Sequence, residues 1–225
     1  MNFIKPNWPA PPNIHAYTTT RAAGDFADLQ NRPLLNKLLA LPNDPIWLKQ
    51  EHGTMAVKAD SVPKNTVADA SYTDQANTVC AVLTADCLPL LLCDRQGTGV
   101  AAIHAGWRGL AAGVIEQTLK TFACPAHEIL AWLGPAIGPE VFEVGNEVKE
   151  QFIAVDTQAE IAFKPSPQGR WLADIYLLAK QRLVKYGINA IYGGKFCTYT
   201  DTQQFFSYRR DHDARRMATV IWLTL

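Results

Sequence analysis

The sequence lacks the patterns that would place the chain in a membrane. No segment holds 18 consecutive apolar residues, the length typical of a membrane-spanning helix. The first residues also lack the basic region and apolar run of a secretory signal peptide. We therefore expect no membrane association and a cytoplasmic location.

The sequence also lacks an excess of charge of either sign. Lys and Arg together number 21, as do Asp and Glu, so the formal net charge is zero. Proteins that bind nucleic acid by neutralising phosphates are usually basic. The charged fraction of 19% is below the usual ~25%, while 48% of the residues are hydrophobic. These values predict a compact chain with no nucleic-acid partner, and 225 residues fit one domain.

Histidine and cysteine are scarce, with five of each in the chain. An odd cysteine count without regular spacing does not match a disulfide framework, so we expect reduced thiols. Five histidines can build one small metal site but not a multi-metal cluster. Nothing in the sequence indicates a required protein partner.

Short apolar runs bounded by turn residues predict buried strands. The expected strands lie at 17–20, 46–48, 79–83, 88–93, 100–103, 129–133 and 218–225. Helical spacing of apolar residues predicts helices at 34–41, 110–122, 148–155 and 171–186, the last ended by Gly187. No repeat or linker divides the chain, so we predict a single domain over residues 1–225.

Two candidate ligands follow apolar strands. Cys87 ends the segment 84–87 after one strand, and His104 ends the strand that begins at Val100. Strand ends are places where loops gather and ligands bind. If the two strands are neighbours, Cys87 and His104 approach each other. Each residue taken alone also fits a role in the core, as a buried thiol or a hydrogen-bonded histidine.

His52 is a third candidate, because it precedes Gly53 after the apolar segment 46–48. With Cys87 and His104 it would form a mixed nitrogen and sulfur site. Three protein ligands leave a fourth tetrahedral position open, as in catalytic zinc sites. The intervals between the three residues match no short zinc motif, so spacing alone does not establish the site.

Arginines provide candidate anion sites. Arg108 stands at the start of a predicted helix, where free backbone N–H groups attract anions. Further candidates are Arg21, Arg209 and Arg210. The segment 205–211 mixes arginine with aromatic residues and could stack a planar base, although an edge strand with an aromatic core face fits the pattern better.

The remaining histidines and cysteines are expected to be structural. We expect the surface to hold His15, His127 and His212. Cys80 and Cys93 lie inside apolar strands and are predicted to be core residues, whereas Cys197 is expected in the core or a pocket wall.

Four motifs in order resemble those of the YfiH family, also called the laccase-domain or polyphenol oxidase family. They occupy 84–89, 104–109, 134–139 and 206–211, and the resemblance extends from about Trp47 to Leu225. It implies a single α+β domain of mixed β-sheets flanked by helices, similar to the cytotoxic necrotizing factor toxins. The segment 1–45 departs from the family, because the chain between Arg21 and His52 is shorter than usual. We therefore expect an altered N-terminal pocket wall.

The same resemblance implies a zinc-dependent purine nucleoside phosphorylase. Its substrates would be phosphate and adenosine, inosine or methylthioadenosine, with adenosine deamination as a side activity. The resemblance assigns Zn²⁺ to His52, Cys87 and His104. We expect Arg21 or Arg108 to hold phosphate. Asp86 is expected to orient His104 or to take a proton.

Two other interpretations stay open, and a third, a three-copper laccase, is excluded by the histidine count. A Cys–His hydrolase or deamidase would use Cys87 as nucleophile and His104 as its base. A zinc-stabilised binding domain would need a closed site with a fourth protein ligand, for which the sequence offers no good candidate. A laccase with a three-copper cluster needs roughly eight to ten histidine ligands. The chain has no His-x-His pair, although Cu²⁺ could load the single site and oxidise phenols incidentally.

Overall fold

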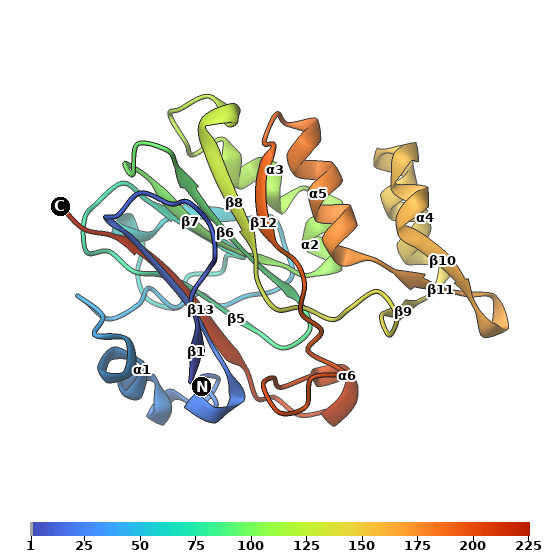
Figure 1. Cartoon of the computed structure of the whole chain (residues 1–225), viewed down its shortest axis with the longest axis horizontal. Coiled ribbons are helices and arrows are strands. Elements are labelled where there is room, and N and C mark those ends of the chain that lie inside the picture. Colours follow the sequence, from blue (N-terminus) through green and yellow to red (C-terminus); the bar gives the residue numbers. More distant parts are fainter. Residues whose placement is uncertain (1) are drawn as a thin grey trace.

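Figure 1 shows the computed structural model, which describes residues 2–225. Its largest sheet contains β12 (Ala190–Gly193), β8 (Ile129–Leu133), β6 (Leu88–Asp94), β7 (Val100–Ala105), β4 (Ala70–Thr73) and β3 (Ala56–Lys58), in spatial order. A second sheet contains β1 (Phe3–Ile4), β2 (Ile14–Thr19), β13 (Met217–Leu223) and β5 (Cys80–Thr84). A small sheet contains β10 (Phe163–Ser166), β11 (Arg170–Ala173) and β9 (Glu143–Val144). Parallel and antiparallel pairs both occur in the largest sheet, as expected for mixed sheets.

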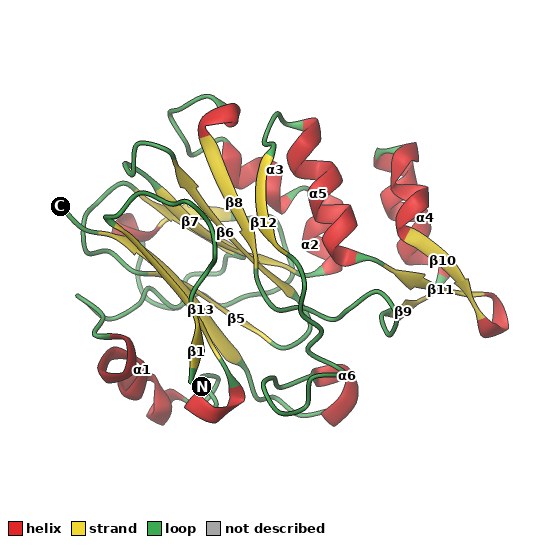
Figure 2. Ribbon diagram, in the orientation of Figure 1, coloured by secondary structure: helices red, strands yellow, loops and turns green. Residues whose placement is uncertain are grey.

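The helices lie outside the sheets. They are α1 (Arg32–Leu39), α2 (Trp107–Ala112), α3 (Val114–Leu119), α4 (Asn146–Val155), α5 (Ile175–Lys185) and α6 (Tyr208–Asp211). Figure 2 shows α2, α3 and α5 along one side of the largest sheet, with the second sheet on its other side and α1 beyond that. No helix within residues 2–225 is long and apolar enough to span a membrane.

The largest sheet is buried on both faces, and β6 shows why. Its side chains alternate between two cores, as the two-residue period of a strand requires. Leu90 and Leu92 pack toward the helices, whereas Leu91 and Cys93 pack against the second sheet. A strand covered on both faces needs a continuous apolar run, which is the pattern that the sequence shows at 88–93.

The chain crosses from the second sheet to the largest sheet between β5 and β6. The crossing segment holds Ala85, Asp86 and Cys87, and Asp86 has a left-handed backbone with φ of +83°. On the far side, Leu88 pairs with Ala105 at the end of β7. The crossing therefore places two of the sequence motifs side by side.

Two helix predictions are corrected. The spacing predicts one helix over 110–122, but Gly113 has a φ of +103° and separates α2 from α3. The spacing also predicts a helix from 171, but 171–173 belong to β11 and α5 begins only after Asp174. The Asp174 carboxylate accepts a hydrogen bond from Leu177 N–H, which caps the helix at that point. Gly187 does end this helix, with a left-handed φ of +88°.

Two strand predictions are also wrong. The segment 46–48 is extended, but it makes only an isolated bridge from Ile46 to Cys80 because it lies beside the second sheet without joining it. The segment 205–211 is a loop followed by the single-turn α6, rather than an edge strand. Ser207 caps this turn by accepting a hydrogen bond from Arg210 N–H. The other predicted strands are confirmed within a few residues at each end.

Candidate functional site

His52, Cys87 and His104 come together at the crossing between the two sheets. Their ligand atoms all lie within 4.8 Å of one another. Cys87 Sγ is 3.7 Å from His52 Nε2, and the two imidazole rings meet edge to face with centroids 4.8 Å apart. His104 is buried, Cys87 is half-buried and His52 is exposed, so the cluster opens toward solvent on one side.

Cys87 and His104 meet because β6 and β7 are paired. His104 lies opposite Pro89, and the last pair at this end joins Leu88 to Ala105. Cys87 directly precedes Leu88 and therefore lies just beyond the paired region, close to His104. The strand before Cys87 is β5, which packs against β7 as expected but belongs to the second sheet and does not pair with β7. The proximity arises from the strand that follows Cys87.

His52 is held by the segment on either side of it. The Gln50 side chain donates to Leu83 carbonyl and accepts from Leu83 N–H, both at 2.8 Å, and so attaches the segment to β5. The buried Asp69 carboxylate accepts hydrogen bonds from the backbone N–H of Glu51, His52 and Gly53. These contacts bring an exposed loop to a fixed position beside Cys87.

Two glycines of the motif at 104–109 allow the close approach. A Cβ atom at Gly106 would lie 2.8 Å from the His52 ring and 3.1 Å from Cys87 Sγ. At Gly109 it would lie 2.6 Å from the carbonyl oxygen of Gly53. Real Cβ atoms almost never come this close to other atoms. Glycine is therefore required for α2 to begin against the cluster.

The three side chains form a strongly coupled set of charges. Burial opposes ionisation of Cys87, but the charge of His104 and hydrogen bonds from both histidines outweigh it and lower the thiol pKa to about 6. Burial also opposes protonation of His104, but the Cys87 thiolate and the Asp69 carboxylate outweigh it and raise its pKa to about 9. The cluster therefore favours a thiolate, which is the form that binds metals.

The donor set fits a metal ion. Two imidazole nitrogens and one thiolate match the ligands that Zn²⁺ uses, and Cu²⁺ accepts the same types. Among residues 2–225, no other group of three or more His, Cys, Asp or Glu residues is arranged to hold a metal. The set contains no fourth protein ligand, so the arrangement is that of an open site rather than a closed structural one.

A cavity of about 730 Å³ adjoins the cluster. This volume is within the range of small-molecule sites. Its walls combine three arginines, Arg108, Arg209 and Arg216, with the aromatic residues Trp107, Phe142 and Tyr208. Each guanidinium lies over one of these rings, at 4.5 Å for Arg108 on Trp107, 5.7 Å for Arg209 on Phe142 and 5.6 Å for Arg216 on Tyr208. The cavity is therefore cationic and partly apolar, which suits an anion together with a planar group.

Asp86 lines the cavity but serves different partners from those expected. Its carboxylate accepts hydrogen bonds from Thr198 Oγ1 at 2.6 Å, Ser207 Oγ at 3.0 Å and Arg209 N–H at 2.7 Å. Asp69, and not Asp86, accepts the hydrogen bond from His104. Asp86 thus fastens the motif at 206–211 to the segment that carries Cys87.

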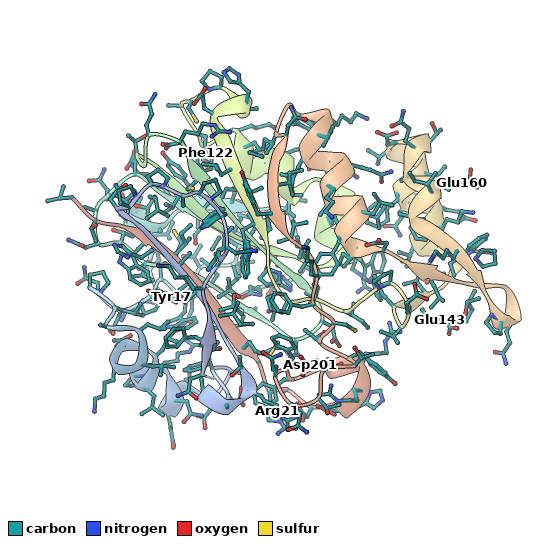
Figure 3. All side chains as sticks on the ribbon, viewed as in Figure 1. Tyr17, Arg21, Phe122, Glu143, Glu160 and Asp201 are labelled. Atoms are coloured by element: carbon teal, nitrogen blue, oxygen red, sulfur yellow. The ribbon has the colours of Figure 1, made fainter. Side chains whose placement is uncertain are left out.

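Arg21 does not line this cavity. Its guanidinium donates to the Thr202 carbonyl and lies over the Phe206 ring at 5.4 Å. Figure 3 labels Arg21 beside Asp201 and away from Glu143, whose carbonyl accepts a hydrogen bond from Arg209. Of the two arginines expected to hold phosphate, only Arg108 therefore reaches the cavity. Arg210 is also outside it, bound to Asp211 and to backbone carbonyls.

The other histidines and cysteines follow most of the expectations. His127 and His212 are exposed, whereas His15 is half-buried and stacks on Trp222. Cys80 and Cys93 are fully buried. Cys197 Sγ accepts a hydrogen bond from Gly138 N–H at 3.2 Å, behind the wall formed by the loop at 134–138.

Sequence reasoning missed several residues of the site. Asp69 belongs to no recognisable motif, because a single aspartate before a short strand occurs in many sequences without a functional role. Phe142 and Arg216 belong to none of the four motifs, and Tyr208 was considered only as part of an aromatic segment. Their grouping depends on how the small sheet and the C-terminal segment pack beside β5.

Comparisons with known proteins identify the family of the chain. A family model described as multi-copper polyphenol oxidoreductase laccase matches residues 23–224. A protein named purine nucleoside phosphorylase YfiH from Shigella flexneri is 49% identical over 240 residues, with 98% of each chain covered. A purine nucleoside phosphorylase from Haemophilus influenzae is 46% identical, with 99% of each covered.

Solved structures confirm the fold. The crystal structure of a Neisseria meningitidis protein matches with a TM-score of 0.93 at 41% identity and covers 100% of both chains. The structure of YlmD from Geobacillus stearothermophilus matches with a TM-score of 0.88 at 24% identity, covering 100% of this chain and 97% of that one. Because the sequence match spans nearly the whole chain and the folds agree, this protein belongs to the multi-copper polyphenol oxidoreductase laccase family, which includes the relatives named purine nucleoside phosphorylase YfiH.

Proposed function

We propose that the protein is a zinc-dependent purine nucleoside phosphorylase. The observation that supports this most is a cationic, aromatic cavity with an open His–Cys–His cluster in its wall. Phosphate needs the cationic groups, and a nucleoside needs the apolar surface. The relatives named purine nucleoside phosphorylase support the same activity.

In the proposed reaction, a phosphate oxygen attacks the anomeric carbon of the ribose. The glycosidic C–N bond breaks, its electron pair goes to the purine, and the purine nitrogen takes the proton that the hydrogen phosphate gives up. The products are the free base and the sugar 1-phosphate, which is ribose 1-phosphate from adenosine or inosine and 5-methylthioribose 1-phosphate from methylthioadenosine. Adenosine, inosine and methylthioadenosine all contain this bond, and we propose them as substrates, with adenosine deamination as a side activity.

The chain's own residues would bind and orient the reactants. Arg108 and Arg209 offer planar guanidinium groups that match phosphate oxygens. Arg209 is held in place by its hydrogen bond to the Glu143 carbonyl and by the contact of its backbone N–H with Asp86. Asp86 therefore acts on the reaction by positioning Arg209, in place of the expected role beside His104.

His52, Cys87 and His104 would hold the Zn²⁺ ion. Bound there, Zn²⁺ supplies a Lewis acid next to the cavity. Cu²⁺ could occupy the same ligands, which would give incidental oxidation of phenols. The rest of the cavity wall includes the apolar side chains of Ile137 and Ile175, which would pack against the nucleoside.

An inosine assay with and without phosphate tests the proposal. Purified protein of measured zinc content should release hypoxanthine and ribose 1-phosphate only when phosphate is present. Arg108→Gln should raise the KM for phosphate about tenfold or more, because one guanidinium contact is lost. Arg95→Gln, on an exposed loop outside the cavity, is the matched control and should leave KM unchanged. Release of hypoxanthine without phosphate would contradict the proposal.

A Cys–His hydrolase is a second candidate, because the cluster also contains the elements of a nucleophilic triad. The Cys87 thiol has a lowered pKa, and Asp69 Oδ1 accepts from His104 Nδ1 at 2.7 Å. Covalent labelling by an alkylating agent separates the two functions. A zinc-bound thiolate is protected, so rapid labelling of Cys87 in zinc-loaded protein would favour the hydrolase.

A further inference from the structure

We propose that Asp69 is a positioning residue that sets both histidines of the cluster at once. Asp69 directly precedes β4, and its side chain is 2% exposed. Its Oδ1 contacts the ring of His104 and the His52 N–H, and its Oδ2 accepts from the N–H groups on either side of His52. The inference rests on the proposed function only in taking the cluster as a metal site.

The contact with His104 selects one form of its ring. Asp69 Oδ1 lies 2.7 Å from His104 Nδ1, and the Asp69 carbonyl accepts from His104 N–H, also at 2.7 Å. A carboxylate can only accept, so Nδ1 carries the proton. Nε2 is then the ring nitrogen left for the cluster. Histidine ligands commonly have this kind of carboxylate partner, which fixes ring orientation and raises ligand basicity.

The contact with the loop holds His52 in a conformation that costs energy. His52 has a φ of +60°, which is uncommon for a residue with a side chain. Three successive N–H groups, from Glu51, His52 and Gly53, point at the Asp69 carboxylate, at 3.3, 2.9 and 2.6 Å. Successive N–H groups of this kind form a concave anion site. The buried negative charge therefore stabilises the turn that presents the His52 ring to Cys87.

The two oxygens of Asp69 are both used as acceptors, and this makes an asparagine substitution a sharp test. An asparagine side chain has one acceptor oxygen and one donor NH₂ group in place of the two acceptors. If the amide oxygen took the place of Oδ1, it would still accept from His104 and His52, but the NH₂ group would face the N–H groups of Glu51 and Gly53, donor against donor. If the amide were turned around, the NH₂ group would face the protonated Nδ1 of His104 and the His52 N–H in the same way. Asp69→Asn should therefore weaken either the turn that carries His52 or the contacts with both histidines, although it keeps the shape of the side chain.

The connection between β6 and β7 offers a matched control. Asp94 is also buried, and its carboxylate accepts hydrogen bonds from Gln96 N–H, Thr98 N–H and Thr98 Oγ1. It lies at the other end of β6 from the cluster. Asp94→Asn removes the same charge from a similar backbone cradle, but it touches no residue of the cluster.

The experiment compares the Zn²⁺ affinities of the full-length wild type and both variants by competition with a chromophoric chelator. Asp69→Asn should weaken Zn²⁺ binding about 10- to 100-fold, the usual effect of losing such a partner. Asp94→Asn should lower the melting temperature without changing the affinity. Unchanged affinity in folded Asp69→Asn, or an equal loss in Asp94→Asn, would overturn the proposal.

A second measurement needs no variant and covers the case in which Asp69→Asn does not fold. ¹⁵N NMR of histidine-labelled, zinc-loaded wild type should show His104 with a proton on Nδ1 and the metal on Nε2. Metal on Nδ1 would overturn the role of Asp69. Neither readout uses a nucleoside. Zinc binding that depends on Asp69 in a protein without phosphorolysis would refute only the proposed function, and a wild type that binds no Zn²⁺ would refute both.

Discussion

Antiparallel β6 and β7 form a hairpin whose two ends both have a cysteine and a buried carboxylate, but in different surroundings. The closed end is the turn after Asp94, and the open end is the one beside Cys87 and His104. At the closed end, Cys93 lies between the sheets and Asp94 binds the connecting turn. At the open end, Cys87 lies beside two histidines, and Asp69 binds the loop and ring that hold them. A cysteine with a nearby buried carboxylate is therefore part of the core at one end and part of a cluster that could hold a metal at the other.

The difference lies in what surrounds each thiol. Burial raises the pKa of Cys93, and the charge of Asp94 raises it further. Cys87 also resists ionisation through burial, but His104 and His52 reverse the effect and lower its pKa to about 6. At the open end, the histidine partners come from β7 and from the loop at 50–53. Reactivity depends on these neighbours and not on the cysteine itself.

Removing each thiol should give the largest contrast. Cys87→Ala should lose bound Zn²⁺ and all phosphate-dependent release of hypoxanthine, because two histidines alone make a poor zinc site. Cys93→Ala should keep both and lose about 1–2 kcal/mol of stability through the cavity it leaves. Metal analysis, the inosine assay and urea unfolding measure these effects. Phosphorolysis by metal-free Cys87→Ala would contradict the assignment of the site.

Alkylation should separate the two thiols by rate. In metal-free protein at pH 7.5, Cys87 should react at least ~10² times faster than Cys93, because only an accessible thiolate is nucleophilic. A lowered pKa means that the thiolate persists at lower pH, so the Cys87 rate should fall only as the pH drops through about 6. Mass spectrometry of iodoacetamide-treated protein across pH measures this. A midpoint near 9 would show that the histidines do not act on Cys87.

Replacing a glycine by alanine at either end of the β6–β7 hairpin should change Zn²⁺ binding or stability less than removing Cys87 does. Gly106→Ala places a Cβ atom 2.8 Å from the His52 ring and 3.1 Å from Cys87 Sγ, so the ligands must move. We expect Zn²⁺ affinity to fall about tenfold, as it does when ligand positioning is disturbed. Gly99→Ala at the closed end meets Tyr72 at 3.0 Å and should affect only stability. Equal zinc affinities in Gly106→Ala and wild type would show that the site tolerates displacement.

Removing the metal should have the smallest effect on the fold. The hydrophobic cores on both faces of the largest sheet do not include the cluster. At free Zn²⁺ about 100 times the Kd, metal stabilises by about 2.7 kcal/mol, so chelation should lower the melting temperature by roughly 5–10 °C. Calorimetry with and without chelator measures the shift, with Cys87→Ala as the unresponsive control. Unfolding on chelation would favour the zinc-stabilised binding domain.

Much of the fold could be predicted, because the buried strands have continuous apolar runs. The strands at 88–93 and 129–133 are examples, since a sheet covered on both faces leaves no room for polar positions. The break at Gly113 was missed, because a single glycine is tolerated inside many helices. The residues at 171–173 were missed because apolar spacing there continues into the helix. Only pairing with β9 and β10 makes them a strand.

The candidate site could be predicted only in part, because local motifs reveal some of its residues and not others. The motifs identified His52, Cys87 and His104 as candidate metal ligands and Arg108 as a candidate anion site, and the structure brings these residues together. They did not identify Asp69, and they suggested Arg21, which lies outside the cavity. A carboxylate that accepts hydrogen bonds from a distant loop has no local pattern, because its partners are chosen by strand pairing rather than by neighbouring residues.

The sequence by itself determined which atoms are available for chemistry: two imidazoles, one thiolate and a few guanidinium groups, too few histidines for a multi-copper cluster. The tertiary structure alone decided which of them meet. Pairing of β6 with β7 brings Cys87 to His104, and Asp69 brings His52 to both. The physical reason is that ligand identity is a property of single residues, whereas a metal or substrate site requires distances of a few ångströms between residues far apart in the chain.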